Sequence, residues 1–195
     1  MKERFEDYLR QCPLMAILRG ITPGEIEGVW EVLHEAGFRL LEIPLNTPEA
    51  LKSIRIATDV CKDRMMVGAG TVLTPREAEE VCESGGRFVV SPNTNPGVIR
   101  RTKELGMLSM PGFFTATEGF TALEAGADYL KLFPACLGPS YIKDLQAVLK
   151  APIVAVGGVN VENVSSFLAV CHGVGIGSAL YKPKRELAQI SAIAH

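Results

Sequence analysis

Short runs of β-prone apolar residues recur along the chain at nearly even intervals. Eight such runs occur, at 14–18, 40–43, 65–69, 88–91, 107–110, 129–133, 153–156 and 173–177. Their centres lie about 19 to 26 residues apart, which is the length of one strand, one helix of two to four turns and two loops. This regular alternation predicts a parallel sheet with a helix after each strand.

The segments between these runs carry signals for the start and end of helices. At Thr22 and at Thr74 a capping Thr is followed by Pro at the first helical position and Glu at the third, and Thr115 with Glu118 offers a further capping box. A Gly stands where a left-handed residue would end a helix just before four of the strands, at Gly37, Gly85, Gly106 and Gly126. The helix-to-strand loops should therefore be very short.

Eight such units with one uniform composition fit a closed barrel better than an open doubly wound sheet, which more often has five or six strands. Neither a dinucleotide-binding G-x-G-x-x-G nor a Walker A motif opens the first helix. We expect residues 1–195 to form a single, compact (β/α)8 TIM barrel domain. A chain of 195 residues is short for this fold, so the loops should be minimal and some helices short.

Composition and charge narrow the classes of partner. The chain has 20 basic and 22 acidic residues, a net charge of -2, and no basic stripe, which argues against nucleic acid. No stretch reaches the roughly 18 apolar residues of a membrane span, and the N-terminus lacks the apolar segment of a signal peptide, so we expect a cytoplasmic protein. The five cysteines and three histidines show no metal-binding spacing, and we expect reduced thiols and no metal.

A lysine in an apolar strand is the most informative candidate for chemistry. Reacting groups in such barrels lie at the C-terminal ends of the strands, and Lys131 stands there between Leu130 and Leu132. An inward lysine loses hydration, which lowers its pKa, and a neutral amine attacks carbonyl groups. The alternatives are a structural pairing with Glu42 or a side chain that reaches outward.

Three other polar residues end the first three strands. Glu42 could move protons as a general acid or base, or could form a plain salt bridge. Arg19 offers a planar fork for the carboxylate of an α-keto acid, although an arginine there is also often a structural tether. Thr71 could bind the same carboxylate, and turn formation is the alternative.

Glycines end the last two strands. Gly157 and Gly158 follow the seventh strand, and Gly177 with Ser178 follows the eighth. Their backbone N–H groups could approach a phosphate at a helix N-terminus, and these two loops commonly bind phosphate in this fold. The need for a tight turn would explain either glycine motif alone, whereas the two motifs together favour a phosphate-binding site.

The whole chain also resembles the bacterial 2-keto-3-deoxy-6-phosphogluconate/6-phosphogalactonate aldolase family. The matching motifs appear in the family's order: AILRG (16–20), EIPLNTP (42–48), GAGTVL (68–73), SPN (91–93), PG (111–112), TATE (115–118), KLFPA (131–135), VGGV (156–159) and GIGSALY (175–181). The segment 160–173 departs from the family's usual pattern, which bears on the loop geometry near the phosphate.

The resemblance implies a class I aldolase with Lys131 as the Schiff-base nucleophile and Glu42 as the acid/base. By the same resemblance, the substrate-binding residues are Arg19 and Thr71 at the carboxylate, Pro92 and Phe133 as an apolar wall, Val156 and Gly157 beside them, and Gly158, Gly177 and Ser178 at the phosphate. The resemblance further implies a homotrimer that uses no cofactor or metal.

Two positions bear on the substrate. Phosphogluconate-type members usually have Thr at position 156 and Arg at position 46, whereas this chain has Val156 and Asn46. The resemblance therefore implies reversible cleavage of 2-dehydro-3-deoxy-6-phosphogalactonate to pyruvate and D-glyceraldehyde 3-phosphate, as in galactonate degradation. The alternatives are the phosphogluconate epimer as substrate, an isomerase, epimerase or synthase on a phosphate-binding barrel, and a barrel that only binds a phosphosugar.

Overall fold

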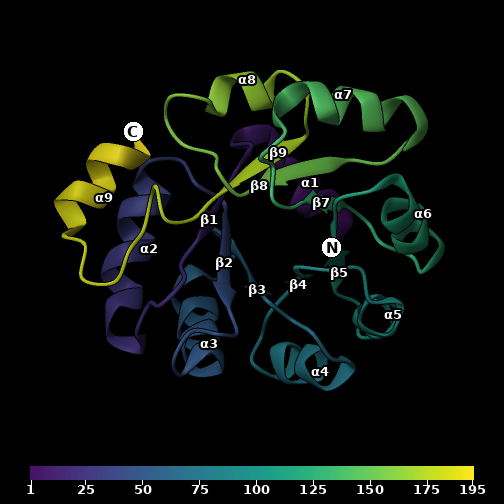
Figure 1. The fold of residues 1–195 in the computed structure, drawn as a ribbon. Helices are drawn as coiled ribbons and strands as arrows, with labels where there is room; N and C mark the ends of the chain where they lie inside the picture. The colour runs from purple at the N-terminus through teal and green to yellow at the C-terminus, as the bar shows by residue number, and fades with distance from the viewer.

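The computed structural model describes residues 1–195 as a parallel barrel ringed by helices (Figure 1). One sheet of nine strands runs in the order β5-β4-β3-β2-β1-β9-β8-β7-β6. The two strands at the ends of that order, β5 (Leu108–Met110) and β6 (Gly112–Phe113), belong to one continuous segment that is interrupted at Pro111. The Lys131 amide donates to the Pro111 carbonyl (2.9 Å), so this segment closes the barrel.

The remaining strands lie where the apolar runs predict them. They are β1 (Leu14–Ile17), β2 (Leu40–Pro44), β3 (Met66–Gly70), β4 (Phe88–Val90), β7 (Leu130–Leu132), β8 (Ile153–Val156) and β9 (Gly173–Ile176). The (β/α)8 barrel is thereby confirmed, with eight strand positions. The break at Pro111 was not predicted, and it arises because proline cannot donate to the strand ladder.

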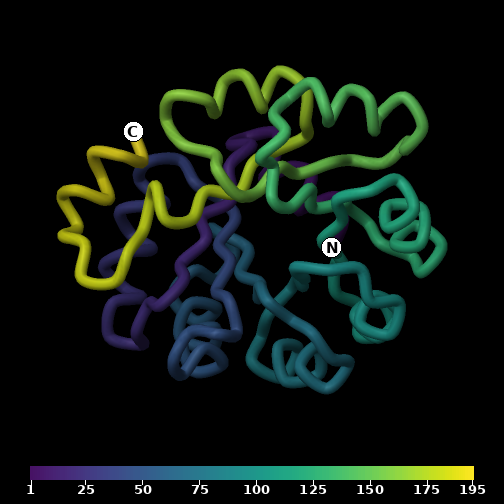
Figure 2. The backbone as a smooth tube through the Cα atoms, viewed as in Figure 1, coloured from purple at the N-terminus to yellow at the C-terminus, as the bar shows by residue number.

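Helices follow the strands around the outside of the barrel. They are η1 (Pro23–Glu25), α2 (Ile26–Glu35), α3 (Ala50–Cys61), α4 (Pro75–Glu83), α5 (Pro96–Glu104), α6 (Ala116–Glu124), α7 (Gly138–Val148), α8 (Val164–Leu168) and α9 (Leu187–Ala194). All three predicted capping boxes form, and the four predicted stop glycines have φ between +73° and +98°. Figure 2 shows the helical segments as a ring in which α9 returns beside α2.

The helix α1 (Lys2–Gln11) was not predicted, because its charged residues leave few apolar positions. It covers the N-terminal end of the barrel, behind the strands in Figure 1. Phe5 is fully buried, with its ring 5.5 Å from the Phe88 ring and 4.9 Å from the Tyr129 ring, centroid to centroid. Phe5 therefore plugs the end of the barrel opposite the predicted site.

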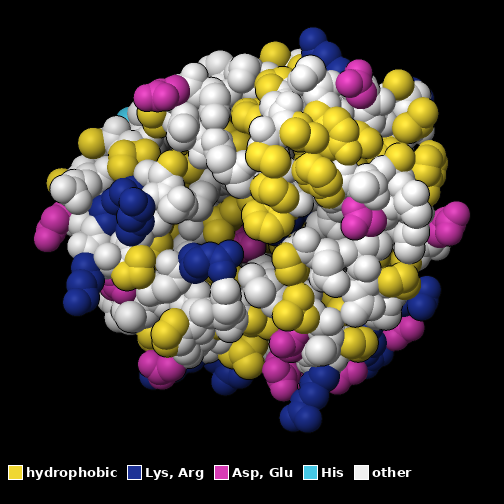
Figure 3. Space-filling view, viewed as in Figure 1, with side chains coloured by type: hydrophobic (Ala, Val, Ile, Leu, Met, Phe, Trp, Pro, Cys, Tyr) yellow, Lys and Arg dark blue, Asp and Glu magenta, His cyan; other side chains and the backbone are white.

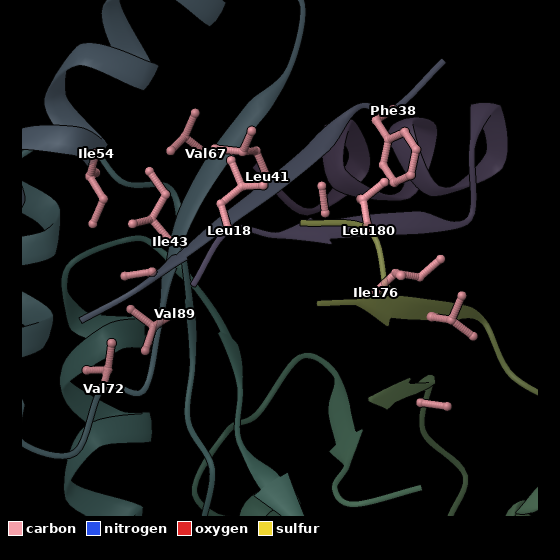
Figure 4. Packing of buried hydrophobic residues seen from close by; sticks show 14 of the residues in the cluster. Leu18, Phe38, Leu41, Ile43, Ile54, Val67, Val72, Val89, Ile176 and Leu180 are labelled. Atoms are coloured by element: carbon pink, nitrogen blue, oxygen red, sulfur yellow. The ribbon is translucent and has the colours of Figure 1, made fainter. Parts of the chain in front are cut away.

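Buried apolar side chains form two clusters. Fourteen residues, including Phe5, Met15 and Val156, fill the barrel interior. Forty-two residues, including Leu18, Leu41 and Ile43, pack between the strands and the helices, and Figure 4 shows part of this layer. No helix has the length and apolar character needed to cross a bilayer.

Candidate active site

Two ionisable side chains lie in the barrel interior near the C-terminal ends of the strands. Lys131 on β7 follows the interior residue Tyr129 by two positions, and Glu42 on β2 follows the interior residue Leu40 in the same way. Because alternate residues of a strand share a face, both side chains enter the barrel. Lys131 is only 6% exposed and Glu42 only 2%, so both groups lose most of their hydration.

A glycine on the neighbouring strand makes room for the Glu42 carboxylate. Gly70 pairs with Pro44 on β2, and a Cβ atom at position 70 would lie 1.7 Å from Oε1 of Glu42. Any other residue here would displace the carboxylate. The GAGTVL motif thus shapes the site as well as ending β3.

The Glu42 carboxylate is buried without a partner. Its Oε2 atom makes no hydrogen bond, and none of the ion pairs within 4.0 Å joins Glu42 to Lys131 or Arg19. Burial raises the pKa of Glu42 to about 7, against the opposing effect of the positive charges of Lys131 and Arg19. The plain salt bridge is therefore not formed, and Glu42 can hold or release a proton near neutral pH.

Burial acts on Lys131 in the opposite sense. Loss of hydration lowers the pKa of the Lys131 ammonium, the negative charge of Glu42 opposes this shift, and the positive charge of Arg19 adds to it. The Nζ atom also lies over the Phe133 ring, 4.6 Å from its centroid. The neutral amine needed for attack on a carbonyl is thus more populated than in water.

The other residues predicted near a carboxylate lie at the same rim. Arg19 follows β1 and is exposed, and the next residue, Gly20, donates its amide to Oγ1 of Thr47 (2.9 Å). Thr71 follows β3 in the left-handed region, with φ of +55°, and Pro92 follows β4; both are half-buried. The structure brings these three residues to one end of the barrel.

A cavity of about 530 Å³ opens at this end. Its lining includes seven of the predicted site residues: Arg19, Phe133, Val156, Gly157, Gly158, Gly177 and Ser178. Figure 3 views this face, where a hollow near the centre has basic atoms beside it and hydrophobic side chains along one edge. Arg19 and the predicted phosphate contacts therefore border one space, whereas Lys131, Glu42, Thr71 and Pro92 are not among its lining residues.

The two glycine loops differ from the predicted helix N-termini. Gly157 and Gly158 adopt φ of +92° and +83°, but the helix α8 begins only at Val164. After Gly177 a single helical turn forms, in which the Tyr181 amide donates to the Gly177 carbonyl (2.9 Å). The loops come close together because β8 and β9 are neighbours, and loop backbone replaces the expected helix ends.

Three polar residues of the cavity were missed from the sequence. Asn160, Tyr181 and Lys182 line the same space. Lys182 had a visible signal, since it opens a basic segment directly after GIGSALY. Asn160 begins the segment 160–173, whose departure from the family pattern indicated the loop geometry near the phosphate but not a role for this side chain.

Comparison with known proteins agrees with this geometry. The family model described as "KDPG and KHG aldolase" matches residues 5–193. The chain belongs to this family. Its members are aldolases, so the chain is an aldehyde-lyase on a barrel that carries the family's motifs.

Individual members of the family extend the likeness. A "probable 2-dehydro-3-deoxy-6-phosphogalactonate aldolase" of Rhizobium meliloti (strain 1021) is 49% identical, over 88% of this chain and 82% of the relative. The 2-dehydro-3-deoxy-6-phosphogalactonate aldolase of Escherichia coli (strain K12) is 48% identical, over 88% and 86%. A solved structure described as "Native KDPGal structure" is 44% identical, over 94% of this chain and 91% of that chain, with a TM-score of 0.91.

Proposed function

We propose that this family member is a class I aldolase that reversibly cleaves 2-dehydro-3-deoxy-6-phosphogalactonate to pyruvate and D-glyceraldehyde 3-phosphate. The observation that carries the proposal is the burial of Lys131 beside an unpaired, buried Glu42 at the C-terminal end of the barrel. A buried amine and a carboxyl group with a pKa near neutrality are the two groups that Schiff-base chemistry requires.

Lys131 acts as the nucleophile in this proposal. Its neutral amine adds to the C2 carbonyl, and the resulting carbinolamine loses water to form an iminium ion. Removal of the C4 hydroxyl proton then breaks the C3–C4 bond, whose electron pair moves into the iminium and forms an enamine. The aldehyde leaves, and protonation at C3 followed by hydrolysis releases pyruvate and restores the amine.

Glu42 moves the protons of these steps. It gives a proton to the departing hydroxyl of the carbinolamine and can take the proton of the C4 hydroxyl before C–C cleavage. A pKa of about 7 suits both directions of transfer, because each protonation state is populated at neutral pH.

Substrate-binding roles follow the positions at the C-terminal end of the barrel. We assign the pyruvate carboxylate to Arg19 and Thr71, and the apolar wall of the pyruvate unit to Pro92 and Phe133. Gly158, Gly177 and Ser178 are assigned to the phosphate, with Gly157 shaping the turn between them. This chemistry requires no cofactor or metal, because the iminium itself accepts the electron pair.

The galactonate epimer is the favoured substrate for two reasons. The relatives that are 48–49% identical carry that name, and Val156 cannot hydrogen-bond the C4 hydroxyl by which the epimers differ. Discrimination by shape alone is worth about 1–3 kcal/mol, so we expect appreciable activity on the gluconate epimer. The second candidate function is cleavage of the phosphogluconate epimer as the main reaction.

The experiment is a steady-state comparison of the two purified epimers, with pyruvate release as the readout. We expect a higher kcat/KM for the phosphogalactonate. A preference above roughly 10³-fold for the phosphogluconate would overturn the assignment of the epimer but not the Schiff-base mechanism. An isomerase, an epimerase or a non-catalytic phosphosugar-binding barrel would release no pyruvate from either compound.

We further infer a homotrimer in the cytoplasm. The trimer rests on the family resemblance and on large apolar side chains that remain exposed in the single chain, among them Leu137 (54%) and Val148 (53%) of the α7 region. Figure 3 shows hydrophobic side chains gathered over the start of α7, beside the hollow. All five cysteines are free, which suits a reducing compartment.

A further inference from the structure

The charge of the cavity points to a ligand with two anionic ends. Among the fifteen lining residues are two cations, Arg19 and Lys182, and no Asp or Glu. The remaining polar groups of the lining are uncharged: backbone amides, the Ser178 hydroxyl, the Asn160 amide and the Tyr181 phenol. A phosphate held by these groups alone would keep its full charge in a partly enclosed site, which is unfavourable without a counter-ion.

Lys182 occupies the end of the cavity formed by the loop after β9. It follows Ser178 by four residues and comes directly after the helical turn that Gly177 begins. No ion pair within 4.0 Å involves the Lys182 ammonium, and its side chain is exposed to the cavity and solvent. The charge is therefore available to a ligand.

The backbone around Lys182 is held on both sides, which limits where the ammonium can reach. The Tyr181 hydroxyl donates to Oε1 of Glu25 (3.1 Å), a residue of the capping box that follows β1. Arg185 donates to the carbonyls of Ala179 and Leu180, both at 2.7 Å.

The loop after β1 also meets this segment. A Cβ atom at Gly20 would lie 2.7 Å from Cγ of Pro183, so only a glycine allows the two loops to pack this closely. The loop that carries Arg19 and the loop that carries Lys182 are thereby fixed against each other beside the cavity.

We propose that Lys182 binds the substrate phosphate and selects for phosphorylated substrates. This inference rests on the proposed function and deepens it. Arg19 and Lys182 then divide the two anionic groups of the substrate, with the carboxylate at Arg19 and the phosphate at Lys182 together with Ser178 and the glycine amides.

The test compares Lys182→Ala with Lys182→Arg and with a control, Lys184→Ala, which removes the same charge from the same loop outside the cavity lining. The aldol reaction of pyruvate is measured with D-glyceraldehyde 3-phosphate and with D-glyceraldehyde. We expect Lys182→Ala to lower the ratio of kcat/KM for the phosphorylated over the unphosphorylated aldehyde by about 10- to 100-fold, the range for a hydrogen bond to a charged group. Lys182→Arg should keep most of the ratio, and Lys184→Ala should leave it at the wild-type value.

Binding of inorganic phosphate, measured by calorimetry, supplies a readout without catalysis. Lys182→Ala should weaken it by a similar factor and Lys184→Ala should not. An equal effect of the two alanine variants, or none, on both readouts overturns the role of Lys182. A wild-type protein that joins neither aldehyde to pyruvate overturns the proposed function, while the phosphate titration still decides for or against Lys182.

Discussion

At the scale of single residues, the site combines burial with the absence of a close partner. Several exposed acids and bases elsewhere in the chain form ion pairs, such as Arg101 with Glu79 (2.8 Å), whereas Glu42 and Lys131 are buried and form none. Each of the two therefore has a pKa shifted toward its neutral form. This arrangement costs stability and makes proton transfer possible near neutral pH.

Replacement of Glu42 by Gln tests the part of this carboxyl group in proton transfer. We expect Glu42→Gln to lower turnover by about 10²- to 10⁴-fold, the range for loss of a positioned proton-transfer group, with phosphate affinity nearly intact. Steady-state cleavage and phosphate titration measure both quantities. An unchanged turnover number would remove Glu42 from the mechanism.

The same variant should change how stability depends on pH. Folding raises the pKa of Glu42 from 4.5 to about 7, so between these values the folded state keeps a proton that the unfolded state has lost. Stability contributed by this group is complete below about pH 4.5 and falls as the pH rises through 7, by up to about 3 kcal/mol at 1.36 kcal/mol per unit.

Urea denaturation at pH 5 and pH 8 measures the effect. Glu42→Gln should lose less stability between the two pH values than the wild type, because Gln carries no titrating proton. The exposed Glu31→Gln should behave as the wild type. Equal losses in the wild type and Glu42→Gln would contradict the raised pKa.

Val156 provides a third test at this scale. It is 5% exposed at the end of β8 and lines the cavity. Val156→Thr adds a hydroxyl with little change in volume, and we expect it to shift the kcat/KM ratio toward the gluconate epimer by about 10-fold or more. Val156→Ala, which changes shape without adding a hydroxyl, should give no such shift, and a Thr variant with an unshifted ratio would remove position 156 from epimer selection.

At the scale of elements, the features that recur along the chain are the ones that the sequence predicts best. The eight apolar runs, the capping boxes at Thr22, Thr74 and Thr115 and the stop glycines each act within a few residues of one another, so local physics decides them. The Lys131 and Glu42 positions could be predicted for the same reason, since strand alternation places their side chains.

Features set by distant neighbours could not be predicted in this way. Gly70 makes room for Glu42 from the neighbouring strand, and Lys182 lines the cavity on a loop that a hydrogen bond ties to Glu25, far away in the sequence. Helix α1 could not be predicted because its three buried side chains are interspersed with charged residues. Its contribution to the fold depends on its packing against the barrel.

The docking of α1 can be tested through Phe5. This ring is fully buried against Phe88 and Tyr129, so Phe5→Ala should cost about 3–5 kcal/mol of unfolding free energy in urea denaturation. Lys2→Ala, on the exposed part of the same helix, should cost less than about 0.5 kcal/mol. A loss below about 1 kcal/mol for Phe5→Ala would mean that α1 does not plug the barrel in solution.

At the scale of the whole molecule, the two ends of the barrel have separate tasks. The N-terminal end is closed by α1 and packed with apolar side chains, and the C-terminal end holds the buried pair and the cavity. Substitutions at the first end should therefore alter stability, and those at the second should alter catalysis.

Assembly belongs to this scale as well. We expect light scattering coupled to size-exclusion chromatography to give three times the mass of one chain, because the exposed apolar side chains near α7 gain stability when they are buried between copies. A mass equal to one or two chains at micromolar concentration would contradict the trimer.

The proposed chemistry depends on a Schiff base between Lys131 and pyruvate. Incubation with pyruvate and sodium borohydride, followed by peptide mass spectrometry, tests it most directly, because reduction of the iminium leaves a stable adduct on the reacting lysine. We predict one adduct of reduced pyruvate on Lys131, inactivation in proportion to it, and no adduct in Lys131→Arg. Absence of the adduct from Lys131 in the wild type, or its appearance on another lysine with equal loss of activity, would contradict the role of Lys131 as the nucleophile.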